Sequence, residues 1–311
     1  MEIFEDNKFV LHRIKFFILI ILQISAIVIS LLIFAFFITH RAILNILQNQ
    51  ALLALIIVNF VELVADLSMP ISFYYLGYVK PATNGYCIWW TFFEYNLHLI
   101  SELLVATISI QRHILIFQAN IFHNRFKRFM FYYIPLVLCF IYPIILYIII
   151  IILYPCDGTQ WDYTSNLCGY ANCYLIYNKV LGTFDWAANN GSPVVIIMLA
   201  NMTLVIRVIR HKRRQRQANS WKKQRRMTIQ LLTISSLYLF AWLPSLIIGV
   251  TQQLNSPSFL ANIQTDYTLD FIYLIALLSP WIYLKLLPEL MKWLGNLLCR
   301  GLIVHNAVRP I

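Results

Sequence analysis

Charged residues are scarce in this chain. Asp, Glu, Lys and Arg make up 12% of the 311 residues, whereas a soluble globular domain has about a quarter. Apolar residues make up 60% of the chain, and its mean hydropathy is +0.70. The polar surface is therefore too small to cover a chain of this length in water. This composition indicates a membrane protein.

Other sequence signals are missing as well. The strand-length alternation that would predict a β-barrel is absent. We find neither a His/Asp cluster typical of a metal site nor a nucleophile elbow, so we expect no enzyme activity, no cofactor and no bound metal. There is no long linker, no internal repeat, and no small-residue cleavage site after the first apolar run. We therefore expect a single domain over residues 1–311.

Long apolar runs are what the sequence has in abundance. Each of seven runs is long enough for a helix to cross a bilayer, and helices are expected because backbone groups in lipid must be satisfied within the segment. We predict an all-α membrane protein, a seven-transmembrane-helix bundle with a short amphipathic helix after the seventh span. The predicted spans are 16–39, 50–76, 86–116, 129–154, 187–209, 228–250 and 267–287, and the amphipathic helix is 288–299.

Positive charge is concentrated in alternate connections of the chain. The net charge is +11, and the basic residues gather between the fifth and sixth runs, after the third run and in the tail. The positive-inside rule then places these connections in the cytoplasm and the amino terminus outside. We expect a multi-pass plasma-membrane protein whose basic segments contact lipid headgroups. Nucleic-acid binding is not expected, because the basic block is a tethered membrane loop.

The cysteines fit this orientation. Cys87 stands at the outer end of the third run, and Cys156, Cys168 and Cys173 lie in the loop after the fourth. The outer compartment permits disulfides. Cys87 is expected to pair with Cys168 or Cys173, but the sequence leaves the pairing open. Cys299, on the cytoplasmic side, is a predicted palmitoylation site.

Three separated motifs fall into one family pattern. Cys87 precedes Arg112 by twenty-five residues, the sixth run holds Trp242-Leu243-Pro244, and the seventh holds Ser279-Pro280-Trp281-Ile282-Tyr283. With an exterior amino terminus, the chain resembles the rhodopsin-like class of G-protein-coupled receptors over essentially its whole length. The resemblance implies that an extracellular ligand is converted into activation of a heterotrimeric G protein.

The resemblance also implies roles for individual residues. Arg112 would meet the cytoplasmic partner, Pro244 and Pro280 would kink their helices, and Tyr283 would offer a hydroxyl near the inner face. The sequence departs from the family at this switch: Gln111 replaces an acid, His113 replaces a tyrosine, and Ser279 replaces an asparagine. Asn59 stands where the family has an aspartate, so the sodium site of the family lacks its usual carboxylate.

The third run carries the predicted ligand site. Glu94 lies seven residues after Cys87, which places both on one helix face, and His98 continues down that face. Family spacing brings Glu94 to the position of the acid in amine receptors and Tyr273 to that of its tyrosine partner. Trp242 would lie beneath the cavity. We expect a peptide or amine ligand, since a carboxylate beside aromatics favours a cationic group; a structural acid bonded to Tyr273 or His98 is the alternative interpretation.

A second class of function rests on the intramembrane acids. Ionisable groups within a membrane span are costly and mark ion or substrate paths in many proteins. A small-solute transporter or channel is therefore the alternative hypothesis. Against it, the chain shows no inverted repeat and no matched pair of broken helices. The acids concerned are Glu62, Asp66, Glu94 and Glu102.

Overall fold

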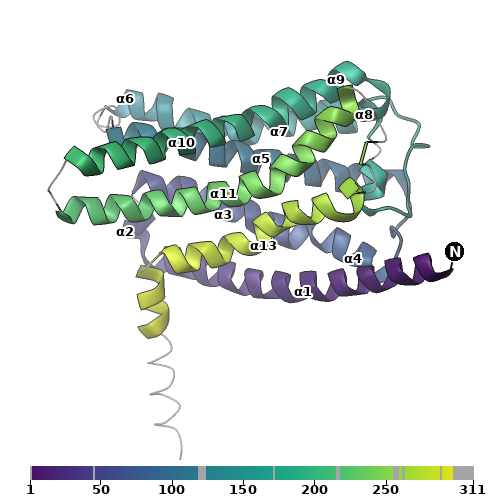
Figure 1. The fold of residues 1–311 in the computed structure, drawn as a ribbon, viewed down its shortest axis with the longest axis horizontal. Coiled ribbons are helices and arrows are strands. Elements are labelled where there is room, and N and C mark those ends of the chain that lie inside the picture. Colours follow the sequence, from purple (N-terminus) through teal and green to yellow (C-terminus); the bar gives the residue numbers. More distant parts are fainter. Residues whose placement is uncertain are drawn as a thin grey trace, which may run out of the picture.

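The computed structural model describes residues 2–44, 46–117, 124–170, 172–214, 218–254, 259–260, 263–287 and 289–296. Within these ranges the elements are helices, and no β-strand occurs among them. The helices run side by side in one elongated bundle (Figure 1). The predicted all-α fold class is confirmed.

The described residues form a bundle of seven helical stretches. The first is α1 (Glu2–Thr39), which the short α2 (Arg41–Leu44) follows. The second is α3 (Leu47–Val61), η1 (Glu62–Asp66) and α4 (Ser68–Leu76), and the third is α5 (Asn84–Phe117). The fourth is α6 (Arg125–Arg128), η3 (Phe129–Tyr133), α7 (Ile134–Tyr147) and η4 (Ile148–Ile152). The fifth is α9 (Lys179–Thr183), η6 (Phe184–Asn190) and α10 (Gly191–Arg214), the sixth is α11 (Ala218–Leu254), and the seventh is η7 (Gln264–Thr268) and α13 (Leu269–Leu286).

The helices differ from the predicted spans mainly at their ends. The fourth stretch stops at Ile152 and the seventh at Leu286, one or two residues earlier than predicted. The fifth begins at Lys179, eight residues before its predicted start. Its polar upper part is helical and not a loop, because the polar side chains there bond to one another inside the bundle, as described below.

A short helix over residues 289–296 follows the seventh stretch. It is bent by 79° from Asp270–Lys285 and leaves the end of the bundle (Figure 1). Its Leu290 is fully buried, and Trp293 and Leu294 pack against the core. These three residues form the apolar stripe expected of an amphipathic helix. Pro288 and Cys299 lie outside the described residues, so lipidation of Cys299 stays a prediction.

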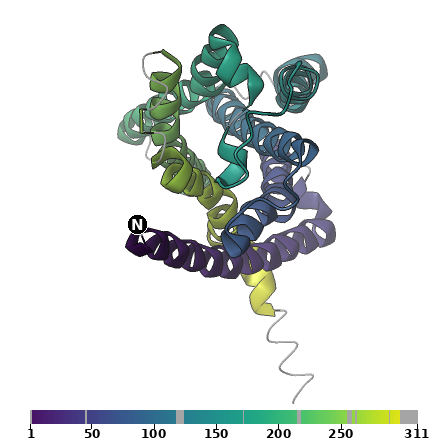
Figure 2. The same ribbon diagram turned by 90° about the vertical axis from the view of Figure 1, so that its right-hand side faces the viewer.

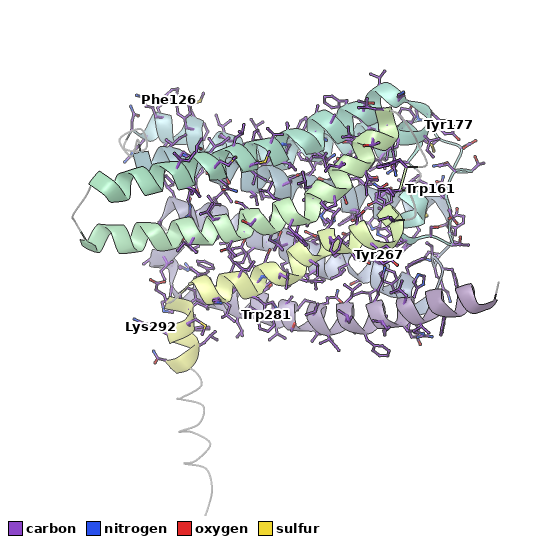
Figure 3. The ribbon with its side chains drawn as sticks, viewed as in Figure 1. Phe126, Trp161, Tyr177, Tyr267, Trp281 and Lys292 are labelled. Atoms are coloured by element: carbon purple, nitrogen blue, oxygen red, sulfur yellow. A yellow bond between two sulfur atoms is a disulfide. The ribbon has the colours of Figure 1, made fainter. Side chains whose placement is uncertain are left out.

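Apolar side chains cover the flanks of the bundle, as a lipid environment requires. On α1, Phe17, Ile21 and Ile24 are each more than half exposed. Figure 3 shows Trp281 on the flank of the bundle, with Phe126 towards one end and Tyr177 at the other. Five described helical stretches are long and apolar enough to cross a membrane, and a sixth is if the bent pair at the seventh stretch counts as one span.

The remaining stretch, α5, is less apolar because it carries the polar core. It contacts α3, α7, α10 and α11, and the end view in Figure 2 shows the helices arranged around a common interior. Polar side chains on a helix so placed can meet partners from its neighbours and avoid lipid. Those that are buried on α5 are Thr91, Glu94, Asn96, His98, Ser101, Glu102, Ser109, Gln111 and Arg112.

Candidate functional site

The loop between the fourth and fifth stretches is fastened over one end of the bundle. Disulfides join Cys87 to Cys168 and Cys156 to Cys173, which resolves the pairing that the sequence left open. Leu167 and Cys168 are fully buried. Cys168 also accepts a backbone hydrogen bond from Asp162 at 3.2 Å. The loop therefore lies against α5 as a fixed lid.

Beneath the lid lies a small cavity of about 30 Å³. Glu94 and His98 line it from α5 and Trp242 from α11. The structure therefore brings three of the four predicted ligand residues together around one cavity. Burial raises the pKa of the lid residue Tyr170 well above its usual range. The other residues that line the cavity are Tyr95, Tyr170, Trp186, Asn190 and Ile272.

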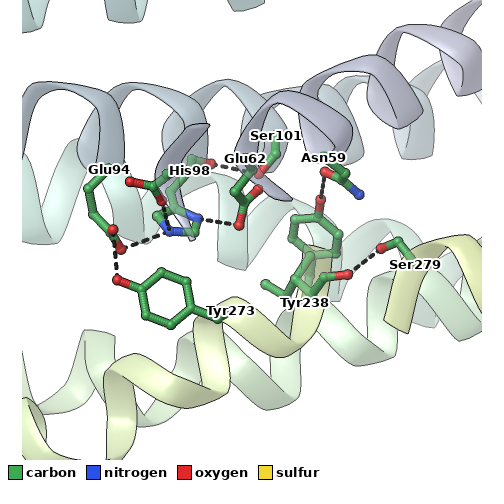
Figure 4. A network of polar contacts seen from close by, with 10 residues as sticks. Asn59, Glu62, Glu94, His98, Ser101, Tyr238, Tyr273 and Ser279 are labelled. Carbon is green, nitrogen blue, oxygen red and sulfur yellow. Dashed lines mark hydrogen bonds and ion pairs between the residues drawn. The ribbon is translucent and has the colours of Figure 1, made fainter. Parts of the chain in front are cut away.

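The fourth predicted residue, Tyr273, approaches Glu94 from α13. Its hydroxyl donates to Glu94 Oε2 at 2.8 Å, and both side chains are buried (Figure 4). The other carboxylate oxygen of Glu94 faces His98 Nε2 at 2.9 Å. The rings of His98 and Trp242 lie edge to face with centroids 5.8 Å apart. Glu94 is thus held between two helices, with one edge on the cavity.

Two further acids reach the same histidine from the second stretch. Glu62 Oε1 lies 3.3 Å from His98 Nδ1, and Asp66 Oδ2 lies 3.9 Å from His98 Nε2. Both acids belong to η1 and have no exposed surface. Asp66, Glu94 and His98 each place one ligand atom so that the three atoms lie within 4.8 Å of one another. The spacing along the chain could not predict this grouping, because it forms between η1 and α5.

Glu102 does not join this cluster. Its two carboxylate oxygens are buried without a hydrogen-bond partner, and its side chain is fully covered. The four acids that the sequence suggested as an ion path are therefore three acids around His98 and one separate acid.

A second polar cluster supports the cavity from the fifth stretch. Asp185 is fully buried and accepts hydrogen bonds from Tyr147 at 3.1 Å, Tyr174 at 2.8 Å and Asn189 at 2.8 Å. Burial and the nearby Asp185 raise the pKa of Tyr174 well above its usual range. The neighbour of this aspartate, Trp186, lines the cavity. The polar run that begins at Asp185 is the sequence signal for this cluster, and it contains Asn189. The tyrosine partners of Asp185, Tyr147 and Tyr174, lie on other segments.

Close packing fixes Trp186 against the sixth stretch. A Cβ atom built on Gly249 would lie 2.4 Å from carbons of the Trp186 ring. Real Cβ atoms do not approach so closely, so any larger residue at Gly249 must displace the indole ring. The glycine is needed here for contact between α11 and η6 and not for an unusual backbone angle.

The predicted switch residues lie towards the opposite end of α5. Arg112 is 4% exposed, and its Nε and Nη1 atoms have no hydrogen-bond partner. It lines a cavity of about 10 Å³ with residues of α3 and α11, among them Leu55 and Leu231. Gln111 instead donates to the backbone carbonyl of Tyr132 at 3.0 Å. The arginine is therefore enclosed by apolar groups.

The other switch residues lie on α5, α11 and α13. His113 Nε2 lies 2.7 Å from the carbonyl oxygen of Ala200 on α10. Ser279 donates to the carbonyl of Ile275 in its own helix, and Tyr283 is buried with an unpartnered hydroxyl. Pro244 and Pro280 lie inside α11 and α13. These residues do not meet Arg112 through any hydrogen bond between described side chains.

Comparison with known proteins adds one finding. A family profile described as 7 transmembrane receptor (rhodopsin family) matches residues 29–283. A search of curated proteins gives no significant match. The matched range runs from within α1 to Tyr283 and so contains the lid, both cavities and every described switch residue.

Proposed function

The chain belongs to the rhodopsin family of seven-transmembrane receptors, and we propose that it couples an extracellular cationic ligand to a heterotrimeric G protein. The family consists of receptors and not enzymes. The observation that carries the ligand class is the Glu94 carboxylate, held by Tyr273 at the edge of an aromatic cavity. An amine, or a peptide with an amino terminus or basic side chain, has the matching charge.

The geometry favours a ligand that reaches the cavity past the lid. The cavity has room for only about two water molecules, so a ligand must displace Tyr170 or Trp186 to contact Glu94. A ligand that moves Trp242 would also move α11, because Trp242 belongs to this helix. The helical hydrogen bonds of α11 are interrupted at Pro244, where the helix can bend. A ligand that binds one helix arrangement better than the other shifts their populations. Ligand binding and helix movement would be coupled in this way.

The two ends of the bundle support a plasma-membrane orientation with the amino terminus outside. The disulfide-bonded lid and the amino-terminal end of α1 lie at the same end (Figure 1). The carboxyl-terminal end of α10 and the amino-terminal end of α11, whose sequences are rich in Lys and Arg, lie at the opposite end (Figure 1). Disulfides favour the extracellular side and clustered bases the cytoplasmic side. The G protein would therefore meet the end that carries Arg112.

A nucleotide-exchange assay tests this function. Amine and peptide libraries are screened on membranes that contain the full chain and a co-expressed G protein. An active compound should lose at least tenfold in potency on Glu94→Gln, because the amide carries no charge. Glu102→Gln is the matched control, since Glu102 is as buried, lies on the same helix and does not line the cavity. Equal potency on Glu94→Gln and the unchanged receptor would refute the cationic-ligand proposal.

The transducer end needs its own test. Arg112→Ala should abolish exchange by the G protein at normal surface expression, because it removes the cation that would meet the partner. Ligand-driven solute uptake or current without nucleotide exchange would contradict receptor function.

A further inference from the structure

We propose that Asp66, Glu94 and His98 form a binding site for a divalent transition metal, with zinc as the best-fitting ion. The three residues come from η1 and α5 and meet beneath the lid. This inference does not depend on the ligand or on G-protein coupling. It concerns what the buried acids do in the resting protein.

The first argument is charge. Glu62, Asp66 and Glu94 are three carboxylates with almost no exposed surface, and among the described residues their ion-pair contacts all go to one histidine, His98. Buried charges are costly unless they are paired or bind a metal. One imidazolium could offset a single negative charge, whereas a divalent cation offsets two and lets the histidine remain neutral. A monovalent ion leaves a larger imbalance.

The second argument is an unpartnered side chain directed at the site. Both carboxylate oxygens of Asp66 are fully buried without a hydrogen-bond donor, although Oδ2 lies only 3.9 Å from His98 Nε2. A buried polar group that lacks a partner is rare and requires an explanation. A cation between Asp66, Glu94 and His98 supplies the missing partner.

The third argument is geometry. In a tetrahedral zinc site, bonds of about 2.0–2.1 Å place neighbouring ligand atoms about 3.3 Å apart. His98 Nε2 lies 2.9 Å from Glu94 Oε1 and 3.9 Å from Asp66 Oδ2, so the two distances bracket that spacing. Nitrogen and oxygen ligands together suit zinc, whereas calcium requires six to eight oxygens. The ligand atoms of Asp66, Glu94 and His98 all lie within 4.8 Å of one another, so side-chain movements alone would complete the first three ligand positions.

The surroundings match those of a metal-bound histidine. Glu62 Oε1 lies 3.3 Å from the other ring nitrogen of His98, Nδ1 (Figure 4). Histidine ligands commonly donate their second N–H to a carboxylate, which fixes the tautomer and orients the ring. Tyr273 holds Glu94 in the same manner through Oε2. The cavity lined by Glu94 and His98 leaves space for a water as the fourth ligand.

Metal binding and the cationic ligand would share Glu94. A metal at this site should therefore weaken the binding of a ligand whose ammonium group needs that carboxylate. The metal measurement needs neither ligand nor G protein, so a failure of one proposal is distinguishable from a failure of the other.

The test is a cobalt titration of the purified full-length chain in lipid nanodiscs, after removal of metals with a chelator. Cobalt(II) reports nitrogen and oxygen coordination through its visible absorption, and zinc should displace it at a ratio of one per chain. His98→Gln should weaken binding about 100-fold or more, and Glu62→Gln about 10-fold to 100-fold as a residue that positions His98. Glu102→Gln should leave the affinity unchanged.

Folding of each variant is checked by its thermal transition without metal. The unchanged protein also decides the question by itself, whatever the variants do. If a tenfold excess of cobalt produces no saturable absorption band in it, the proposal is wrong and the acids are neutralised by protons. Binding that Glu102→Gln and His98→Gln weaken equally would also overturn the assignment to this cluster.

Discussion

Gln111 donates a hydrogen bond to the backbone carbonyl of Tyr132 at 3.0 Å, and Arg112 beside it has two unpartnered guanidinium nitrogens. The two neighbours on α5 therefore face different surroundings. Gln111 ties α5 to the fourth stretch, and no hydrogen bond between described residues restrains the Nε and Nη1 atoms of Arg112. We therefore predict that an acid introduced at position 111 would add a restraint on Arg112.

A carboxylate at position 111 should reduce basal signalling. Gln111→Glu removes the donor to Tyr132, and the new charge is attracted to the guanidinium of Arg112. A charge-assisted hydrogen bond contributes about 1.5 kcal/mol or more, so ligand-independent nucleotide exchange should fall by about tenfold. Gln111→Met is the control, because it loses the same hydrogen bond without adding charge. Equal basal exchange in the two variants would show that the carboxylate does not restrain Arg112.

The two disulfides should contribute unequally to stability. Cys87–Cys168 spans 81 residues and Cys156–Cys173 spans 17, and a bridge that closes a longer loop restricts the unfolded chain more. Thermal unfolding of the purified protein should therefore occur at lower temperature for Cys87→Ser than for Cys156→Ser. Cys139→Ser, which alters a buried free thiol, is the control. A non-reducing peptide map that links Cys87 to Cys173 would contradict the pairing.

Enlarging Gly249 should destabilise the protein and alter the cavity. In Gly249→Ala, the added methyl group must push the Trp186 ring, which it would otherwise meet at 2.4 Å. Overpacking of this kind costs about 1–3 kcal/mol, and the displaced indole should change ligand affinity as well. Gly85→Ala is the matched control, since a Cβ there meets nothing within 4 Å. If the two variants unfold at the same temperature, the contact between α11 and η6 is not tight.

Asp185 should stabilise the fifth stretch through its acceptor oxygens. Asp185→Asn removes the charge and leaves one carbonyl oxygen where the carboxylate oxygens accept from Tyr147, Tyr174 and Asn189. Loss of a partner for buried donors costs about 1–3 kcal/mol, so the thermal transition should fall. Tyr174→Phe should cost less, and the double variant should cost less than the sum. Additive effects would show that the two groups do not interact.

An exposed aspartate provides the comparison for that measurement. Asp157 lies in the lid loop, where hydrogen bonds from Thr159 lower the pKa of its carboxyl group. Because water surrounds it, Asp157→Asn should leave the thermal transition nearly unchanged.

Much of the fold is readable from single segments. Each predicted span lies almost entirely on a helix of the structure, because length and apolarity decide whether a segment crosses a bilayer. The fifth helix begins earlier than the sequence predicts, since the polar residues near Asp185 resemble a loop. Their partners Tyr147 and Tyr174 belong to other parts of the chain, and local composition carries no information about them.

The sequence by itself determined the class of protein, the segments that form the cores of the helices and the motifs of its family. It also predicted that Glu94 and Tyr273 would be near each other, and the structure joins them at 2.8 Å. Only the tertiary structure decided which cysteine pairs with Cys87 and which acids surround His98. Helix formation depends on neighbours along the chain, whereas a buried polar cluster depends on how η1, α5 and α13 pack, so its members can be recognised only after the helices are assembled.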